Sequence, residues 1–208
     1  MFNIVIVIVV CLISYLFGCV STSRFVARTY RNLKLDKIGT GLADTENIYT
    51  NVDKMLGILV GTIDVAKMYV YLLILRFVLD LIAKPLTHTI YMMIFAAVVL
   101  IGHCLPLTHR LRGGRGIFTY IGLVGYFAWM PALISGLFAL IFISFFKQIR
   151  FAQYMVVILP AFINLGIRHF LPSQTNDVLT SITTFPLVVI AILMGVLNIL
   201  VSKRLGEI

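Results

Sequence analysis

The sequence predicts an all-α, polytopic membrane protein, and three observations support this fold class. Hydrophobic residues make up 61% of the 208-residue chain and charged residues only 12%, whereas water-soluble domains are about half apolar and a quarter charged. The apolar residues gather in seven long stretches, and most of the 17 Lys and Arg residues lie between them. This composition excludes a soluble globule and a disordered chain.

The seven apolar stretches are expected to be transmembrane helices of one membrane-embedded domain, residues 1–208, because lipid offers backbone polar groups no partners. The first stretch has no basic leader and no small-residue cleavage site after it, which indicates a retained span. Pro131 favours a break that makes the fourth and fifth stretches a hairpin of two short helices. A single kinked span, giving six in total, is the alternative. The stretches cover residues 2–22, 55–82, 88–105, 116–129, 131–146, 151–171 and 184–201.

The distribution of basic residues predicts an outside N-terminus and an inside C-terminus. With this orientation only Lys84 and Arg168 lie on outer segments, whereas thirteen basic residues lie on the inner segments 23–54, 106–115, 147–150 and 202–208. Such a bias is typical of membrane proteins. The net charge of +9 is then explained by the anionic inner leaflet, and no nucleic-acid partner is expected. The thirteen are Arg24, Arg28, Arg31, Lys34, Lys37, Lys54, Arg110, Arg112, Arg115, Lys147, Arg150, Lys203 and Arg204.

The most informative motif connects the third stretch to the fourth. It reads GHCLP at residues 102–106 and RGGRG at residues 112–116. Glycines let backbone N–H groups approach an anion, and a helix that begins immediately afterwards directs its positive end to the same place. Arg112 and Arg115 add guanidinium groups that suit phosphate. A flexible basic loop is the alternative interpretation. The predicted phosphate site consists of Arg112, Gly113, Gly114, Arg115 and Gly116.

A second cluster lies on the long inner segment, at residues 39–47, which read GTGLADTEN. Gly39, Thr40 and Gly41 could form a close backbone approach to an anion, and Asn47 could hydrogen-bond a hydroxyl or a phosphate. The neighbouring carboxylates of this cluster would repel a phosphate unless a lysine matched them, and Lys34, Lys37 and Lys54 are near in sequence.

Three further candidate site residues lie within the apolar stretches. Asp64 and Lys67 are three residues apart on one helix face, where charged groups must pair or face a polar cavity; a structural ion pair and a site-lining role fit equally well. His103, at the inner end of the third stretch, could bind phosphate or accept a proton. The remaining His and Cys residues show no metal-ligand spacing, so no metal is expected.

In this order and spacing the motifs resemble the PlsY family, the bacterial acyl-phosphate-dependent glycerol-3-phosphate acyltransferases. The resemblance covers essentially the whole chain and rests most on the GHxxP and GGxG elements. It implies a seven-helix enzyme of the bacterial plasma membrane. The implied reaction moves a fatty acyl group from acyl phosphate to the sn-1 hydroxyl of glycerol 3-phosphate, giving lysophosphatidic acid, without a metal or other cofactor.

The resemblance also implies roles for the predicted residues. His103 and Asn47 would act at the reacting groups, the central glycines would hold one phosphate, and residues 39–41 would hold the second substrate. Asp64 and Lys67 would support the floor of the cavity. The chain departs from the family pattern at several positions: Arg115 replaces Lys, Asp44 replaces Gly, Glu46 replaces Thr, and Thr50 replaces an Arg. A catalytically weakened relative that binds lipid or phosphate is therefore a second hypothesis, and a small transporter or channel is a third.

Overall fold

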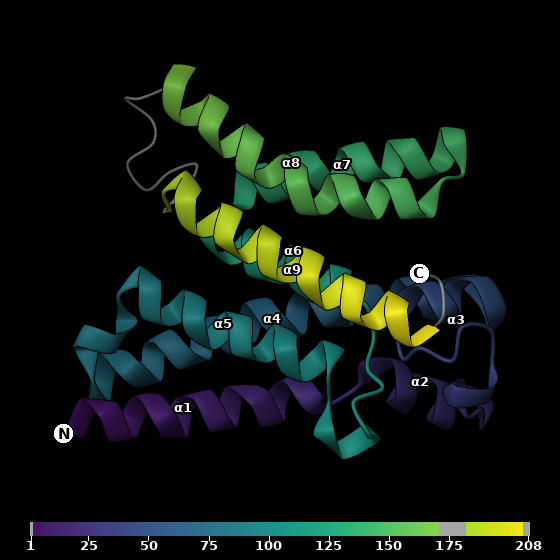
Figure 1. Ribbon diagram of the computed structural model, residues 1–208, viewed down its shortest axis with the longest axis horizontal. Coiled ribbons are helices and arrows are strands. Elements are labelled where there is room, and N and C mark those ends of the chain that lie inside the picture. Colours follow the sequence, from purple (N-terminus) through teal and green to yellow (C-terminus); the bar gives the residue numbers. More distant parts are fainter. Residues whose placement is uncertain (1, 171–181, 206–208) are drawn as a thin grey trace.

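The computed structural model describes residues 2–170 and 182–205, and the regular secondary structure of these residues is helical with no strand among them (Figure 1). The helices are α1 Phe2–Cys19, α2 Thr22–Arg31, α3 Thr45–Asn51, α4 Lys54–Ile82, α5 Thr89–Cys104, α6 Ile117–Phe127, α7 Trp129–Phe146, α8 Ile149–Phe170 and α9 Thr184–Leu205, with short 3-10 turns η1 Leu35–Lys37, η2 Lys84–Thr87 and η3 Leu107–His109. The all-α fold class is confirmed.

Each predicted apolar stretch contains a helix, although not each is long enough to cross a bilayer. Six helical segments are long and apolar enough, with α1 and α2 counted as one. The apolar helix α6 has 11 residues and is therefore about 16 Å long, against a hydrocarbon core of about 30 Å. The number of spans and the outside N-terminus remain predictions.

The break between the fourth and fifth stretches falls earlier than Pro131. Helix α6 ends at Phe127, and α7 begins at Trp129 after Ala128. Pro131 lies in the first turn of α7, where backbone N–H groups have no partner within the helix and a proline costs nothing. The structure has two helices here, α6 and α7, and the break between them falls before Pro131 and not at it.

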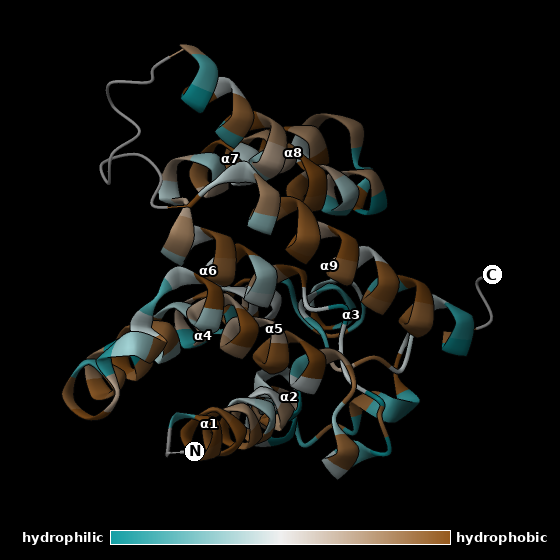
Figure 2. Cartoon of the chain, turned by 60° about the vertical axis from the view of Figure 1, so that its left-hand side comes forward, coloured by the Kyte–Doolittle hydropathy of each residue, from teal (hydrophilic) through white to brown (hydrophobic). Residues whose placement is uncertain are grey.

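Lipid-facing surfaces account for the apolar composition. Large hydrophobic side chains are exposed along the long helices, for example Leu12 on α1, Phe77 on α4 and Leu140 on α7, and Phe77 keeps 66% of its surface accessible. Figure 2 shows hydrophobic residues along α1, α5, α6 and α9, and hydrophilic residues around α3 and the C-terminal end of α9. Contiguous apolar surface of this extent is normally covered by a membrane or a partner.

The polar segments gather at one end of the molecule. Helices α2 and α3, the turn between α7 and α8, and the C-terminal end of α9 all lie at the right of Figure 1. The inner segment 23–54 is largely structured, because Ser21 caps α2, Asp44 caps α3 through the backbone N–H of Asn47, and Asp53 caps α4. These polar segments thus share one end of the molecule, which agrees with the charge bias of the sequence.

Helix α5 holds the His103 motif against α1 through two glycines. A Cβ atom on Gly102 would lie 2.3 Å from the backbone oxygen of Tyr15 on α1, and one on Gly18 would lie 2.3 Å from the backbone oxygen of Val99 on α5. Small residues allow membrane helices this close approach. The first glycine of the GHxxP motif is therefore required for packing, and that packing fixes the position of His103.

Candidate functional site: a groove between α8 and α9

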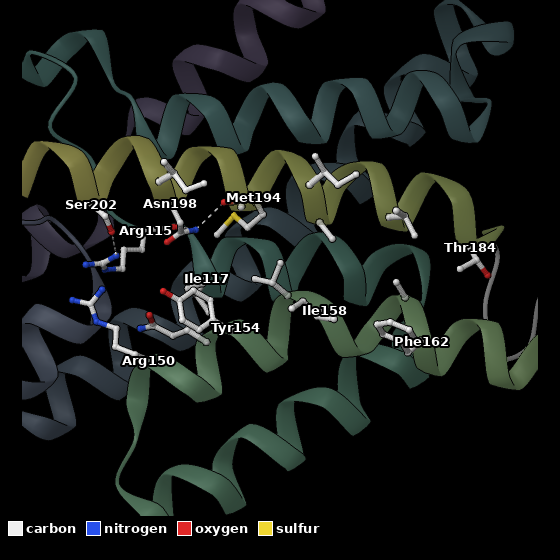
Figure 3. Close-up of a pocket in the computed structure, with 18 of the residues that line it drawn as sticks. Arg115, Ile117, Arg150, Tyr154, Ile158, Phe162, Thr184, Met194, Asn198 and Ser202 are labelled. Carbon is white, nitrogen blue, oxygen red and sulfur yellow. Dashed lines mark hydrogen bonds between the residues drawn. The ribbon is translucent and has the colours of Figure 1, made fainter. Parts of the chain in front are cut away.

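A groove of about 510 Å³ lies between α8 and α9 (Figure 3). Its α8 wall runs from Arg150 to Leu165, which is about 22 Å along a helix axis. Most of the lining is apolar, including Ile158, Phe162 and Ile192. The polar residues at the other end are Arg115, Arg150, Gln153, Asn198 and Ser202. A long apolar groove with a basic end fits an amphiphile with an anionic head.

Helix α9 fixes Arg115 at the polar end of this groove. The side chain is almost completely buried, and its Nη1 donates to Ser202 Oγ at 3.2 Å. Asn198 Nδ2 donates to the backbone oxygen of Arg115 at 3.4 Å. Figure 3 shows the Arg115 and Arg150 guanidinium groups beside each other at this end. Two arginines from different segments therefore converge where an anionic head would lie.

A carboxylate, Glu46, lies against both arginines. Its Oε2 is 3.8 Å from Arg115 Nε, its Oε1 is 3.6 Å from Arg150 Nε, and Gln153 Nε2 donates to Oε2 at 2.8 Å. The sequence suggested lysines as partners for this carboxylate, and the structure corrects this: its partners are arginines from distant parts of the chain.

A small cavity of about 20 Å³ adjoins the groove, because Ile117 and Gln153 line both. His103 and Asp64 also line it. Asp64 Oδ1 is buried and has no hydrogen-bond partner among the described residues, while His103 Nδ1 lies 3.4 Å from Thr119 Oγ1. This volume holds one water-sized group. A substrate hydroxyl would fit here and would satisfy the unpaired carboxylate oxygen.

Asp44 is the second buried carboxylate at this cavity. Burial raises its pKa to about 6, the backbone N–H of Asn47 partly opposes this, and the charge of Glu46 raises it further. Its Oδ1 accepts from Asn47 N at 2.9 Å, whereas Oδ2 has no partner among the described residues. The charged form of Asp44 is therefore costly at neutral pH.

A second basic cavity, of about 560 Å³, is lined by a different part of the predicted site. Thr40, Gly41 and Arg112 meet here, and the cavity also takes in Gly113, Arg110 and Arg204. Arg204 donates to the backbone oxygen of Leu111, which holds the end of α9 against this loop. The predicted phosphate residues are thus divided among the cavities: Arg112 and Gly113 line this one, Gly116 lines the small cavity, and Arg115 lines the groove.

The two central glycines connect elements within the protein. Gly114 N donates to the backbone oxygen of His103 at 3.3 Å, and Ala43 N donates to the backbone oxygen of Gly113 at 3.3 Å. A Cβ on Gly113 would lie 2.2 Å from the backbone oxygen of His103. The GGxG segment therefore joins residues 39–47 to the end of α5. Gly116 is the N-cap of α6 and has a φ of +74°, a conformation that favours glycine.

Asn47 organises the loop that carries Thr40. Its Nδ2 donates to the backbone oxygens of Ile38 at 3.0 Å and Leu42 at 2.9 Å, and its Oδ1 accepts from Thr40 N at 3.3 Å. The side chain is fully buried. Gly39 lies beside it with a φ of +52° and leaves no room for a Cβ. Asn47 therefore positions the loop and does not line the three cavities described above.

Lys67 and Asp64 have different surroundings despite their spacing. Lys67 Nζ donates to the backbone oxygen of Val20 at 2.7 Å and lies 5.6 Å from the centre of the Phe17 ring. Asp64 instead lines the small cavity beside His103. Lys67 therefore ties α4 to the end of α1, and Asp64 is the member of the predicted pair that reaches the cavity.

Sequence reasoning missed the polar residues that α8 and α9 contribute. Arg150 and Gln153 are three residues apart, and Asn198 and Ser202 are four apart. Each pair therefore shares a helix face. This spacing was the available signal, but nothing in the sequence alone shows that the two faces meet at Arg115.

Comparison with known proteins identifies the family. The family model for glycerol-3-phosphate acyltransferase matches residues 8–204. The chain belongs to the glycerol-3-phosphate acyltransferase family. One family member, from Bartonella quintana (strain Toulouse), is 27% identical over 163 residues, which cover 76% of this chain and 74% of that protein. Another, from Shouchella clausii (strain KSM-K16), is 30% identical over 155 residues, covering 71% and 70%.

A solved structure of the glycerol-3-phosphate acyltransferase family has the same fold. It is the crystal structure of PlsY, an integral membrane glycerol 3-phosphate acyltransferase, in its glycerol 3-phosphate form. The TM-score is 0.73 at 18% identity, and the match covers 95% of this chain and 88% of that chain. The resemblance to the PlsY family, inferred from the motifs, is confirmed, as is the membrane-protein fold class.

Proposed function

We propose that this member of the glycerol-3-phosphate acyltransferase family transfers a fatty acyl group from acyl phosphate to the sn-1 hydroxyl of glycerol 3-phosphate. The product is lysophosphatidic acid, made in a bacterial plasma membrane. The observation that carries this proposal is the apolar groove that ends at two arginines beside a cavity with an unpaired carboxylate oxygen. Lysophosphatidic acid has the matching parts, namely an apolar chain and a phosphate head.

The acceptor phosphate is proposed to bind at Arg115 and Arg150, because a guanidinium presents several N–H donors to phosphate oxygens. The hydroxyl of the acceptor would then enter the small cavity lined by Asp64 and His103. The donor phosphate is assigned to the second basic cavity, lined by Arg112 and Arg204 among others. Each of the two phosphorylated substrates is thus assigned to a basic cavity of its own.

The reaction follows from this placement. The acceptor hydroxyl oxygen attacks the carbonyl carbon of acyl phosphate, an ester C–O bond forms, and the C–O bond to the donor phosphate breaks. The hydroxyl proton passes to the Asp64 carboxylate and then to the released phosphate. His103 would polarise the carbonyl as charge develops on its oxygen. Holding both substrates in place supplies much of the rate enhancement, because it removes the entropy cost of the encounter.

The proposed orientation places the arginine end of the groove in the cytosol. The N-terminus is then outside and the C-terminus inside, and soluble glycerol 3-phosphate reaches the site directly. The apolar part of the groove lies within the bilayer, so the product chain remains in lipid.

Acyl transfer by the purified protein tests the proposed function. The protein in lipid nanodiscs is given acyl phosphate and radiolabelled glycerol 3-phosphate, and lysophosphatidic acid is measured by chromatography. We expect product with the wild type and with Arg28→Ala, which removes an exposed arginine on α2, and at least about a hundredfold less product with Arg115→Ala. Absence of product from the folded wild type would contradict the proposal. Phosphate binding without transfer would favour the weakened relative, and solute flux into proteoliposomes would favour a transporter.

A further inference from the structure

Glu46 occupies the position in which the proposed function places a phosphate. One of its oxygens faces Arg115 and the other faces Arg150, at 3.8 and 3.6 Å from the Nε atoms, and Gln153 donates to the oxygen nearer Arg115 at 2.8 Å. A phosphate head at the end of the groove would need the same guanidinium groups. The carboxylate and the substrate are therefore alternatives at this end.

The distances indicate that the carboxylate can be displaced. Charge-assisted N–H···O bonds have lengths of about 2.7–2.9 Å, whereas both Nε contacts of Glu46 are longer than 3.5 Å. A phosphate presents more oxygens and can make the shorter bonds. The Glu46 side chain also keeps 18% of its surface exposed, so the displaced carboxylate would turn toward water.

The charges at this end of the groove also indicate that Glu46 opposes phosphate binding. The Glu46 carboxylate adds a negative charge beside the two guanidinium groups, where the proposed function places a phosphate. A phosphate monoester carries about −1.5 to −2 at neutral pH, so removal of the carboxylate charge would match the head better. Glu46 therefore lowers the affinity of this end for phosphate monoesters, because its contacts with the two arginines must be given up on binding.

We propose that Glu46 is a specificity-determining residue that competes with the substrate phosphate for Arg115 and Arg150. This inference rests on the proposed function, because it assumes that glycerol 3-phosphate is the ligand at this end of the groove. Binding requires the Glu46 carboxylate to leave the two guanidinium groups. Only an anionic head that binds the two arginines more strongly than the Glu46 carboxylate does can displace it, so weakly charged heads are excluded.

Calorimetric binding of glycerol 3-phosphate to the full chain in nanodiscs tests the competition. Glu46→Gln keeps an acceptor for Gln153 and removes only the charge. We expect its Kd to fall at least about tenfold, the change that corresponds to about 1.4 kcal/mol, and Glu46→Ala to change in the same direction. The matched control is Asp80→Asn, which removes a carboxylate from an exposed position on α4 and should leave the Kd unchanged. An unchanged or weaker Kd in both folded Glu46 variants would overturn the inference.

A second measurement uses the wild-type protein and needs no variant to fold. A water-soluble carbodiimide modifies accessible carboxylates, and mass spectrometry reports the modification of Glu46. Saturating glycerol 3-phosphate should increase this modification, because the displaced side chain turns toward water; no increase would contradict displacement. Neither measurement depends on turnover. Tighter binding by Glu46→Gln without any acyl transfer would contradict the proposed reaction and support the competition. Acyl transfer with an unchanged Kd in the Glu46 variants would support the reaction and contradict the competition.

Discussion

Substitution of Arg115 separates the charge of this residue from the shape of its guanidinium. Arg115→Lys keeps a positive charge but loses the hydrogen bond that Arg115 Nη1 donates to Ser202 Oγ at 3.2 Å, which positions the side chain. Arg115→Ala removes the charge as well. Glu46 then keeps its contact with Arg150 at 3.6 Å, and the acceptor phosphate loses one of its two proposed guanidinium partners. A hydrogen bond to a charged group contributes about 1.5–3 kcal/mol, or roughly 10- to 150-fold in a rate or binding constant.

Steady-state acyl transfer with varied glycerol 3-phosphate measures these effects. We expect kcat/KM to fall about tenfold for Arg115→Lys and at least about a hundredfold for Arg115→Ala, which loses one to two charged contacts. The KM for acyl phosphate should change little, because the donor is assigned to the other cavity. Thermal unfolding checks that both variants are folded. Wild-type kcat/KM in folded Arg115→Ala would refute the assignment of the acceptor phosphate to this end of the groove.

Three further predictions concern residues that support the site. Gly102→Ala should lower the unfolding temperature by several degrees, since overpacking costs about 1–3 kcal/mol and its Cβ would meet the Tyr15 backbone oxygen; Gly136→Ala, whose Cβ meets nothing within 4 Å, should be neutral in the same thermal scan. Asn47→Ala should destabilise the protein by about 3 kcal/mol or more in denaturant titration, because it removes four side-chain hydrogen bonds, and equal midpoints would contradict its loop-holding role. Asp44→Asn should stabilise the protein at neutral pH. The folded pKa of Asp44 is raised from 3.8 to about 6, so its favourable contribution is complete below about pH 4 and is lost as the pH rises through about 6. Thermal scans across pH should show the stability difference grow from near zero at about pH 4 to about 3 kcal/mol above about pH 7, and a constant difference would contradict it.

The elements that composition controls could be predicted from the sequence. The apolar stretches predict the helices, because a lipid-exposed segment must satisfy its own backbone groups. The basic segments between them predict which loops share one end, since α2, α3 and the end of α9 lie together. The break before α7 was misplaced because proline was taken as the breaking residue, whereas the first turn of a helix tolerates it.

The site was only partly predictable, because its chemistry depends on distant segments that meet in space. Local motifs indicated Arg115 and His103, and both lie at the polar end of the described cavities. The spacing of Asp64 and Lys67 suggested a pair, yet tertiary packing directs Lys67 to α1. The contact of Glu46 with Arg115 and Arg150 joins segments about 70 and 100 residues apart, and no periodicity within one helix encodes such a contact.

The position of bound phosphate tests the central claim most directly. An experimental structure of the protein with glycerol 3-phosphate, in lipid or detergent, would show where the anionic head lies. The account predicts the phosphate between Arg115 and Arg150, with the Glu46 carboxylate turned away and the acceptor hydroxyl directed at Asp64. A phosphate bound only at the cavity of Arg112 and Arg204, with Glu46 still against both arginines, would contradict it.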